Sequence, residues 1–189
     1  MRTIMVPPAT AGREAVCVNV AIRPALPEDA DALRNIERLA GERFREVGLD
    51  SIADDEPDSI EVLTQYALDG RSWVAIDDAG SSIGYVLVDV VDDCAHIEQV
   101  SVRPDRQGEG VGRALLDRVR LWAISTDRSA ITLTTFGDVP WNRPLYEHLG
   151  FRVLSEIEIG PELRAVRETE ARHGLDPATR VCMRFDVDG

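Results

Sequence analysis

The chain has few cysteines and no long hydrophobic run. Its three cysteines, Cys17, Cys94 and Cys182, make no even disulfide framework, and each lies in or beside an apolar run typical of a strand. We therefore expect buried, reduced thiols and a cytoplasmic location. No cysteine and histidine residues cluster at the spacing of a metal site, so no metal is predicted. No stretch of about 18 apolar residues occurs, which excludes a membrane-spanning helix.

The chain is also poor in positive charge. It has 21 Lys and Arg residues against 34 Asp and Glu residues, a formal net charge of −13 and a pI of about 4.6. This excess of negative charge repels nucleic-acid phosphates and anionic membrane surfaces, so we expect neither as a partner. The charge is compatible with a cationic substrate such as an amine, although an acidic surface also serves solubility alone.

Length and composition predict one folded domain. At 189 residues with 44% hydrophobic residues, the chain is long enough for a packed core and has no linker-like segment. Residues 1–16 lack a continuous apolar run, so we expect a flexible leader and no signal peptide. Residues 17–189 are expected to form the single domain.

Hydrophobic periodicity predicts alternating strands and helices. We expect strands at residues 18–23, 72–77, 83–91, 94–102, 130–136, 151–159 and 180–187. We expect helices at residues 27–47, 59–68, 112–125 and 141–149. The acidic segment 50–58 and the segment 160–179 between the last two strands are expected to be irregular.

The most informative stretch is a glycine-dense turn at residues 107–112, Gln-Gly-Glu-Gly-Val-Gly. It lies between a predicted strand and a predicted amphipathic helix. Glycines let backbone N–H groups approach an anion, and the helix dipole favours negative charge at this end. The turn therefore predicts a phosphate-bearing ligand; a tight strand-to-helix connection without a ligand is the alternative.

Three phosphate-binding motifs compete for this turn. In the dinucleotide fingerprint the third glycine would come one residue later than Gly112. A P-loop needs Lys and then Ser or Thr after its last glycine, and here Arg113 and Ala114 follow. The third motif is Gln/Arg-x-x-Gly-x-Gly/Ala, the turn of the GNAT superfamily of N-acetyltransferases, and residues 107–112 fit it at every fixed position.

Two further segments resemble the same family, in the right order. Residues 22–33 are similar to its first strand and helix, and residues 139–151, Val-Pro-Trp-Asn-Arg-Pro-Leu-Tyr-Glu-His-Leu-Gly-Phe, to its last motif. The resemblance covers roughly residues 20–187. It implies an α/β (α+β) fold with a central mixed, mostly antiparallel, splayed sheet of six to seven strands flanked by helices. It also implies acetyl-CoA as the acyl-donating cosubstrate.

The resemblance assigns donor binding to the strand before the turn, to the turn and to the last motif. Backbone groups of Val100 and Val102 would pair with the pantetheine arm, an N–H near Val100 would polarise the thioester carbonyl, and the turn would hold the pyrophosphate. Asn142 would hydrogen-bond the cofactor arm or cap its own helix. In the commonest pattern of the family more residues separate this Asn from the following Tyr than separate Asn142 from Tyr146 here. The acetyl-CoA-binding residues implied are Val100, Ser101, Val102, Arg106, Gln107, Gly108, Glu109, Gly110, Val111, Gly112, Arg113, Asn142 and Tyr146.

The resemblance also assigns catalytic roles to two residues. Tyr146 occupies the position of a tyrosine that protonates the leaving thiolate, and a packed tyrosine is the alternative. Glu98 is the candidate base, and a carboxyl among apolar strands has a raised pKa. If the strand has no bulge, the side chains of Glu98 and Val102 lie on the same face of the sheet. The alternative to a catalytic role for Glu98 is a solvated strand residue. His96 lies two residues before Glu98 on the same predicted strand, so it is either a proton relay for Glu98 or a packed residue. His148 is expected to lie on the surface.

Acceptor contacts in this family come from the regions that correspond to residues 50–58 and 160–179. The first carries Asp54, Asp55, Glu56 and Asp58, which would help to recruit a cationic amine or simply be solvated. The sequence leaves open whether the acceptor is a small-molecule amine or a protein amine. It also leaves open two other functions, transfer of a longer acyl group and a non-catalytic acyl-CoA-binding sensor. A homodimer is plausible for the family.

Overall fold

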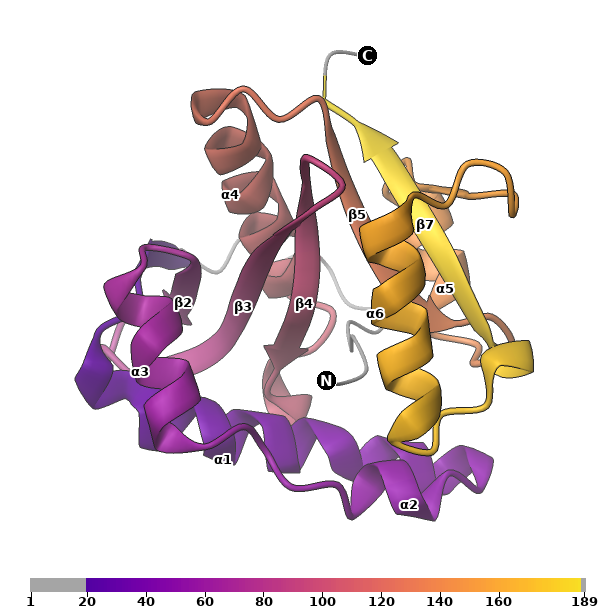
Figure 1. Cartoon of the computed structure of the whole chain (residues 1–189). Helices are drawn as coiled ribbons and strands as arrows, with labels where there is room; N and C mark the ends of the chain where they lie inside the picture. Colours follow the sequence, from indigo (N-terminus) through magenta and orange to yellow (C-terminus); the bar gives the residue numbers. More distant parts are fainter. Residues whose placement is uncertain (1–19, 188–189) are drawn as a thin grey trace.

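The described part of the chain, residues 20–187 of this computed structural model, folds around one seven-stranded sheet in the order β1-β2-β3-β4-β5-β7-β6 (Figure 1). The strands are β1 (Ala21–Pro24), β2 (Ser72–Ile76), β3 (Ser82–Val91), β4 (Cys94–Val102), β5 (Ala130–Phe136), β6 (Arg152–Val153) and β7 (Arg180–Asp186). The helices are α1 (Ala30–Gly41), α2 (Asp50–Ala53), α3 (Ile60–Leu68), α4 (Val111–Ser125), α5 (Arg143–His148) and α6 (Pro161–Arg172). The mixed, mostly antiparallel sheet confirms the predicted fold class.

One strand pair in the sheet is parallel and short. β4 pairs with β5 only through Ala95–Ile131, His96–Thr132 and Ile97–Leu133, whereas every other neighbouring pair is antiparallel. Beyond Ile97 the two strands diverge (Figure 1). The sheet is therefore splayed, and the second half of β4 has no strand on its β5 side among the described residues.

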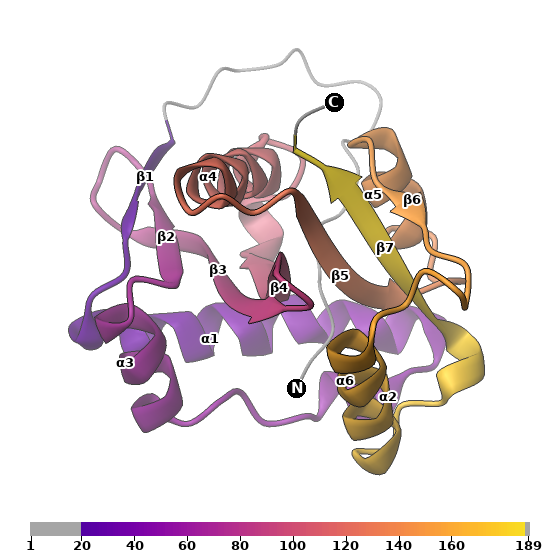
Figure 2. The same cartoon turned by 45° about the horizontal axis from the view of Figure 1, so that its top comes forward.

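Helices cover both faces of the sheet. Figure 2 shows α4 on one face and α1, α3 and α6 on the other. Leu115 and Val119 of α4 pack in a buried cluster with alternate residues of β4, including Val100 and Val102. On the opposite face Leu33 of α1 packs with residues of α3, β2 and β3. Alternation along the central strands thus buries both of their faces.

The structure differs from the predicted elements mainly after α5. The predicted strand 151–159 is only β6, because residues 155–158 form a turn in which the side chain of Glu158 accepts hydrogen bonds from Ser155 N–H and Oγ–H. The segment 160–179 contains α6, with Pro161 at its first position. Only Leu163 and Glu170 of α6 are buried, so its apolar periodicity is weak. Residues 50–58 begin with the short helix α2.

The remaining elements agree with the prediction to within a few residues. Cys94 and Cys182 are buried and unpaired with each other, as expected, and burial raises the pKa of both thiols. Cys17 and the predicted leader, residues 1–16, lie outside the described residues. Within the part of the chain that the structure describes, no helix is long and apolar enough to cross a bilayer.

Candidate functional site

The glycine turn forms the start of α4 as predicted. Gly108 and Gly110 have φ values of 81° and 84°, a left-handed backbone that residues with a Cβ rarely adopt. Gly110 directly precedes the helix and has no side chain to cap it. Among the described residues, the N–H groups of residues 108–113 have no hydrogen-bond partner, so several donors face outward at the positive end of a 15-residue helix.

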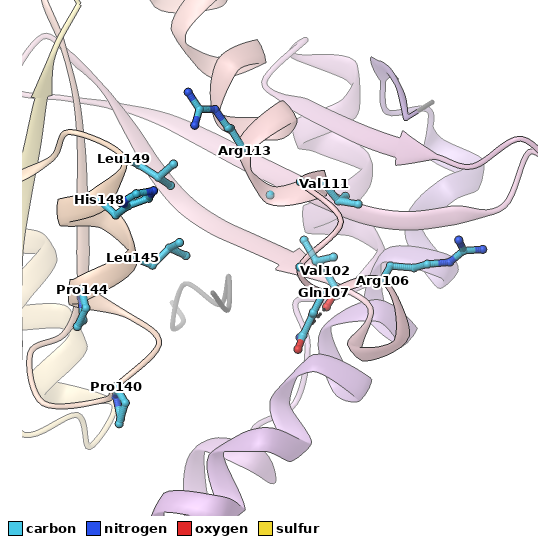
Figure 3. Close-up of a pocket in the computed structure, with 13 residues that line it drawn as sticks. Val102, Arg106, Gln107, Val111, Arg113, Pro140, Pro144, Leu145, His148 and Leu149 are labelled. Atoms are coloured by element: carbon cyan, nitrogen blue, oxygen red, sulfur yellow. Dashed lines mark hydrogen bonds between the residues drawn. The ribbon is translucent and has the colours of Figure 1, made fainter. Parts of the chain in front are cut away.

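These donors lie on one wall of a cavity of about 490 Å³ (Figure 3). The wall on this side consists of Val102, Arg106, Gln107, Gly108, Gly110, Val111, Gly112 and Arg113, all of which the sequence resemblance assigned to donor binding. Two distant segments of the chain, the β4–α4 connection and α5, thus face each other across the cavity (Figure 3).

The opposite wall was largely missed from the sequence. It is formed by Pro140, Pro144, Leu145, His148 and Leu149. Pro144, Leu145, His148 and Leu149 recur at spacings of one, three and four residues, so they lie on one side of α5. This periodicity was readable in the sequence. His148 is exposed as expected, yet it also faces the cavity.

The two arginines of the turn differ in the charges around them. Arg106 is 2.9 Å from an Asp77 oxygen and 3.6 Å from a Glu109 oxygen, so its charge is largely compensated. Arg113 is exposed, lines the cavity and forms no ion pair or hydrogen bond with any described residue. Arg113 is therefore the more available cation for a phosphate. The Gln107 side chain donates to the Val102 carbonyl oxygen, 3.3 Å away, and so fixes the turn against the end of β4.

A β-bulge in β4 changes the expected position of Glu98. Leu87 of β3 pairs with Gln99, but the next residue of β3 pairs with Ile97, so Glu98 has no partner. The extra residue turns Glu98 away from Val102, and the condition of an unbulged strand is not met. Glu98 therefore lies on the face that α1, α3 and α6 cover, opposite the face that packs on α4.

The surroundings of Glu98 suit a base. Burial raises the pKa of its carboxyl to about 7, and the nearby charges of Asp89 and Asp58 act in the same direction. Asp89 is itself held by the hydroxyl of Tyr66 at 2.9 Å and by Arg71. Glu98 is thus half ionised near neutrality and is the most strongly raised carboxyl in the described part of the chain.

Asn142 and Tyr146 are both completely buried, at 0% exposure. Asn142 immediately precedes α5, but its side chain makes no capping bond, and neither its Nδ2 nor its Oδ1 has a hydrogen-bond partner. The Tyr146 hydroxyl also has no partner, and burial raises its pKa well above the usual value of 10. Buried polar atoms are normally bonded, so both side chains have unused capacity for a further polar partner.

Other candidates are less well placed. Val100, Ser101, Glu109, Asn142, Tyr146 and Glu98 are not part of the cavity wall. His96 is buried, its Nδ1 lies 3.0 Å from Thr132 Oγ1, and burial lowers its pKa to about 4, as a packed and neutral histidine requires.

The acidic segment is mostly paired with arginines. Asp54 lies 2.5 Å from Arg45, and Glu56 lies 3.0 Å from Arg38. Its carboxylates are thus compensated, which weakens the case for recruitment of a cation. Among the described residues no group of histidine, cysteine and carboxylate side chains could hold a metal ion.

Comparison with known proteins agrees with this geometry. Residues 69–153, from the end of α3 to β6, match the family model of the acetyltransferase (GNAT) domain. Ard1 from Thermoplasma volcanium is 17% identical, with a TM-score of 0.63 over 89% of this chain and 98% of that one. PaiA N-acetyltransferase from Thermoplasma acidophilum, solved with coenzyme A, is 14% identical, with a TM-score of 0.63 over 89% and 99%.

A third similar structure belongs to a longer protein. N-acetylglutamate synthase from Neisseria gonorrhoeae, solved with coenzyme A and N-acetyl-glutamate, is 22% identical, with a TM-score of 0.65 over 93% of this chain and 36% of that one. With the splayed sheet and the glycine turn at the start of α4, these likenesses show that the chain has the GNAT fold, and its residues 69–153 match the acetyltransferase (GNAT) domain.

Proposed function

We propose that the protein transfers an acetyl group from acetyl-CoA to a primary amine by direct attack within a ternary complex, with Glu98 as base and Tyr146 as acid. The observation that carries this proposal is the cavity in which the unpaired N–H groups of residues 108–113 and the side chain of Arg113 lie on one wall. Anionic oxygens are the ligands that such a helix start prefers.

Acetyl-CoA fits this cavity by its chemistry. Its pyrophosphate would accept hydrogen bonds from the turn, and Arg113 would add a charge-assisted contact. Its pantetheine amides would pair with the free edge of β4 between Val100 and Val102, where β5 has diverged. Two of the similar structures carry coenzyme A by their descriptions, which supports the same donor.

In the proposed transfer the attacking ammonium loses two protons as it becomes an amide. Glu98, as carboxylate, takes the first of them and later releases it to solvent. The nitrogen–carbon bond forms as the carbon–sulfur bond breaks, the sulfur takes the proton of the Tyr146 hydroxyl, and the second amine proton restores the phenol. Burial raises the pKa of Tyr146, so the phenol is protonated at neutral pH. A backbone N–H near Val100 would stabilise the developing oxyanion.

Thiol release from acetyl-CoA tests the proposal. The assay would use a disulfide reagent and a panel of polyamines, aminoglycosides, amino acids and lysine peptides, with mass spectrometry of the acceptor. A gain of one acetyl group on an amine supports the function. Thermal stabilisation by acetyl-CoA without turnover on any amine would instead identify a binding module, and faster turnover of a longer acyl-CoA would change the donor.

A further inference from the structure

Arg180, the first residue of β7, is a buried cation with unused hydrogen-bond donors. Its side chain has 0% exposure, and its guanidinium lies 4.7 Å from the ring centroid of Phe136. Only Nη2 is occupied: it donates to Glu170 Oε1 at 2.5 Å and to Thr134 Oγ1 at 3.0 Å. Nε and Nη1 have no partner. Unsatisfied donors on a buried charge are costly, so Nε and Nη1 have the capacity to bind a further polar group.

Arg180 shares its carboxylate partner, Glu170, with a second arginine. The same carboxylate also lies 3.5 Å from Nε of Arg167, so two guanidinium groups share one carboxylate. His96 adds no charge, because burial lowers its pKa to about 4. A second anionic group beside Arg180 would therefore complete the neutralisation of this buried cluster.

Arg180 also lies at the right place in the fold. It pairs with Phe136, the last residue of β5, beyond the point where β4 and β5 separate. Its side chain is on the sheet face covered by α6, which is also the face of Glu98. Its charge is close enough to Tyr146 to oppose the rise in that pKa. Arg180 thus lies near the proposed acid, on the face of the sheet that carries the proposed base.

We infer that Arg180 determines acceptor specificity by binding a carboxylate through Nε and Nη1 while the acceptor's amine is presented to Glu98. Guanidinium is a donor-only group with a permanent charge, and a carboxylate is its best-matched planar partner. The acceptor is then a small molecule with both an amine and a carboxylate, such as an amino acid. This inference rests on the proposed function and narrows its substrate class.

Matched acceptors test the inference without any mutation. Thiol release from acetyl-CoA would be measured for free amino acids, for their carboxamides and for the corresponding decarboxylated amines. We expect kcat/KM to be about 100-fold higher for the best carboxylate acceptor than for its neutral analogue, because charge-assisted bonds to a buried arginine are lost. Equal or better turnover of amides or polyamines would overturn the role of Arg180 and leave the proposed acetyltransfer intact.

Variants then locate the effect. Arg180→Gln should raise KM for the carboxylate acceptor about 100-fold and change kcat/KM for the neutral analogue less than about threefold. Because this change leaves Glu170 buried beside one cation fewer, the double variant Arg180→Gln/Glu170→Gln provides a folded alternative. Arg184→Gln, on the same strand and face, is the matched control. Equal losses for both acceptors would mean a structural role only.

A direct binding measurement separates the two proposals. If no amine is acetylated, the proposed function fails, and calorimetry with the same amino acids and coenzyme A still tests Arg180. Binding by the wild type that is lost in Arg180→Gln and kept in Arg184→Gln would support the carboxylate site. No binding by the wild type would overturn it.

Discussion

At the scale of single residues, burial sets the protonation states on which the proposed chemistry depends. Tyr146 stays a phenol because its hydroxyl is removed from water, and Glu98 is brought close to neutrality for the same reason. One group is therefore kept as a proton donor, and the other becomes a base that is neither too weak nor fully protonated at pH 7.

Replacement of Tyr146 by Phe removes only the hydroxyl. We expect kcat to fall about 10²- to 10⁴-fold, while the Kd for acetyl-CoA changes less than about threefold, because the ring still packs against Phe151. Steady-state kinetics and calorimetry measure the two quantities. Unchanged turnover in Tyr146→Phe would remove this residue from the mechanism.

Replacement of Glu98 by Gln should slow the reaction and flatten its pH profile. In the proposed mechanism the active form is the carboxylate, so kcat/KM of the wild type should fall about tenfold per pH unit below the pKa of about 7. The variant should lack this acidic limb. A limb that persists in Glu98→Gln would assign the titration to another group.

The same substitution should stabilise the fold at alkaline pH. The pKa of Glu98 is raised from 4.5 to about 7 in the folded state, so ionisation opposes folding. The penalty is absent below pH 4.5, grows as the pH rises, and is complete above pH 7, where it amounts to roughly 3 kcal/mol. Thermal melts at pH 4 and pH 8 should show a much larger gain in Tm for Glu98→Gln at pH 8 than at pH 4. A buried carboxylate that lowers the stability of the folded state at neutral pH is typical of a functional site.

At the scale of elements, the glycine turn before α4 depends on a left-handed backbone conformation that glycine adopts easily. Gly110 has φ of 84°, and a Cβ there would meet no atom within 4 Å, so the free protein has room for a side chain. Gly110→Ala should cost about 1 kcal/mol from the left-handed backbone alone. Gly110→Asp should in addition weaken acetyl-CoA binding at least about tenfold by repulsion of the phosphates. Gly70→Asp, with φ of 67° and equally open space, is the control, and its affinity should be unchanged. Undiminished affinity in Gly110→Asp would refute the phosphate assignment.

The start of α6 is capped from a distant hairpin. The Asp92 carboxylate, in the β3–β4 turn, accepts from the N–H groups of Glu162 and Leu163 at 3.0 and 2.8 Å, and the Glu162 carboxylate accepts from the Asp92 N–H at 2.5 Å. A Cβ on Gly160 would lie 2.3 Å from an Asp92 oxygen. The glycine is thus required by a residue about seventy positions earlier in the chain.

A double-mutant cycle tests this cap. Gly160→Ala and Asp92→Ala should each destabilise the protein by about 1–2 kcal/mol, a loss of a few degrees in Tm. In the Asp92→Ala background the Gly160→Ala change should cost almost nothing, because the colliding carboxylate is gone. Additive losses would show that Gly160 serves a purpose other than space for Asp92.

At the scale of the whole molecule, local pattern predicted the centre of the sheet well and its C-terminal end poorly. β3, β4 and α4 have clear alternation or helical spacing, and the glycine turn is a contiguous motif. β6 has only two paired residues, and α6 buries only two side chains, so neither has a strong local signal. The bulge at Glu98 depends on the register of β4 with β3, which a single strand does not determine. The surroundings of Arg180 are formed by Phe136, Thr134 and Glu170, which lie in other elements, so its burial and pairing could not be predicted from the local sequence.

The chain as a whole contains no lysine, and all 21 of its basic residues are arginines. Guanidinium groups keep their charge throughout the accessible pH range. No lysine ammonium of the enzyme can therefore contribute a titration to the rate, and no lysine of the enzyme can compete with the acceptor for the acetyl group.

The short β4–β5 pairing also divides the molecule mechanically. Its two halves are joined through three residue pairs in the sheet and by α4 across one face. Across the other face they are joined by the ring contacts of Phe44 with Phe136 and Trp141 and by the bonds of Asp92 to α6. Loss of the Asp92 bonds would loosen this joint at the end of the sheet that carries the β3–β4 turn. Spin labels at the exposed positions Leu68 and Ile157, one on each half, should then report a broader distance distribution in Asp92→Ala than in the wild type.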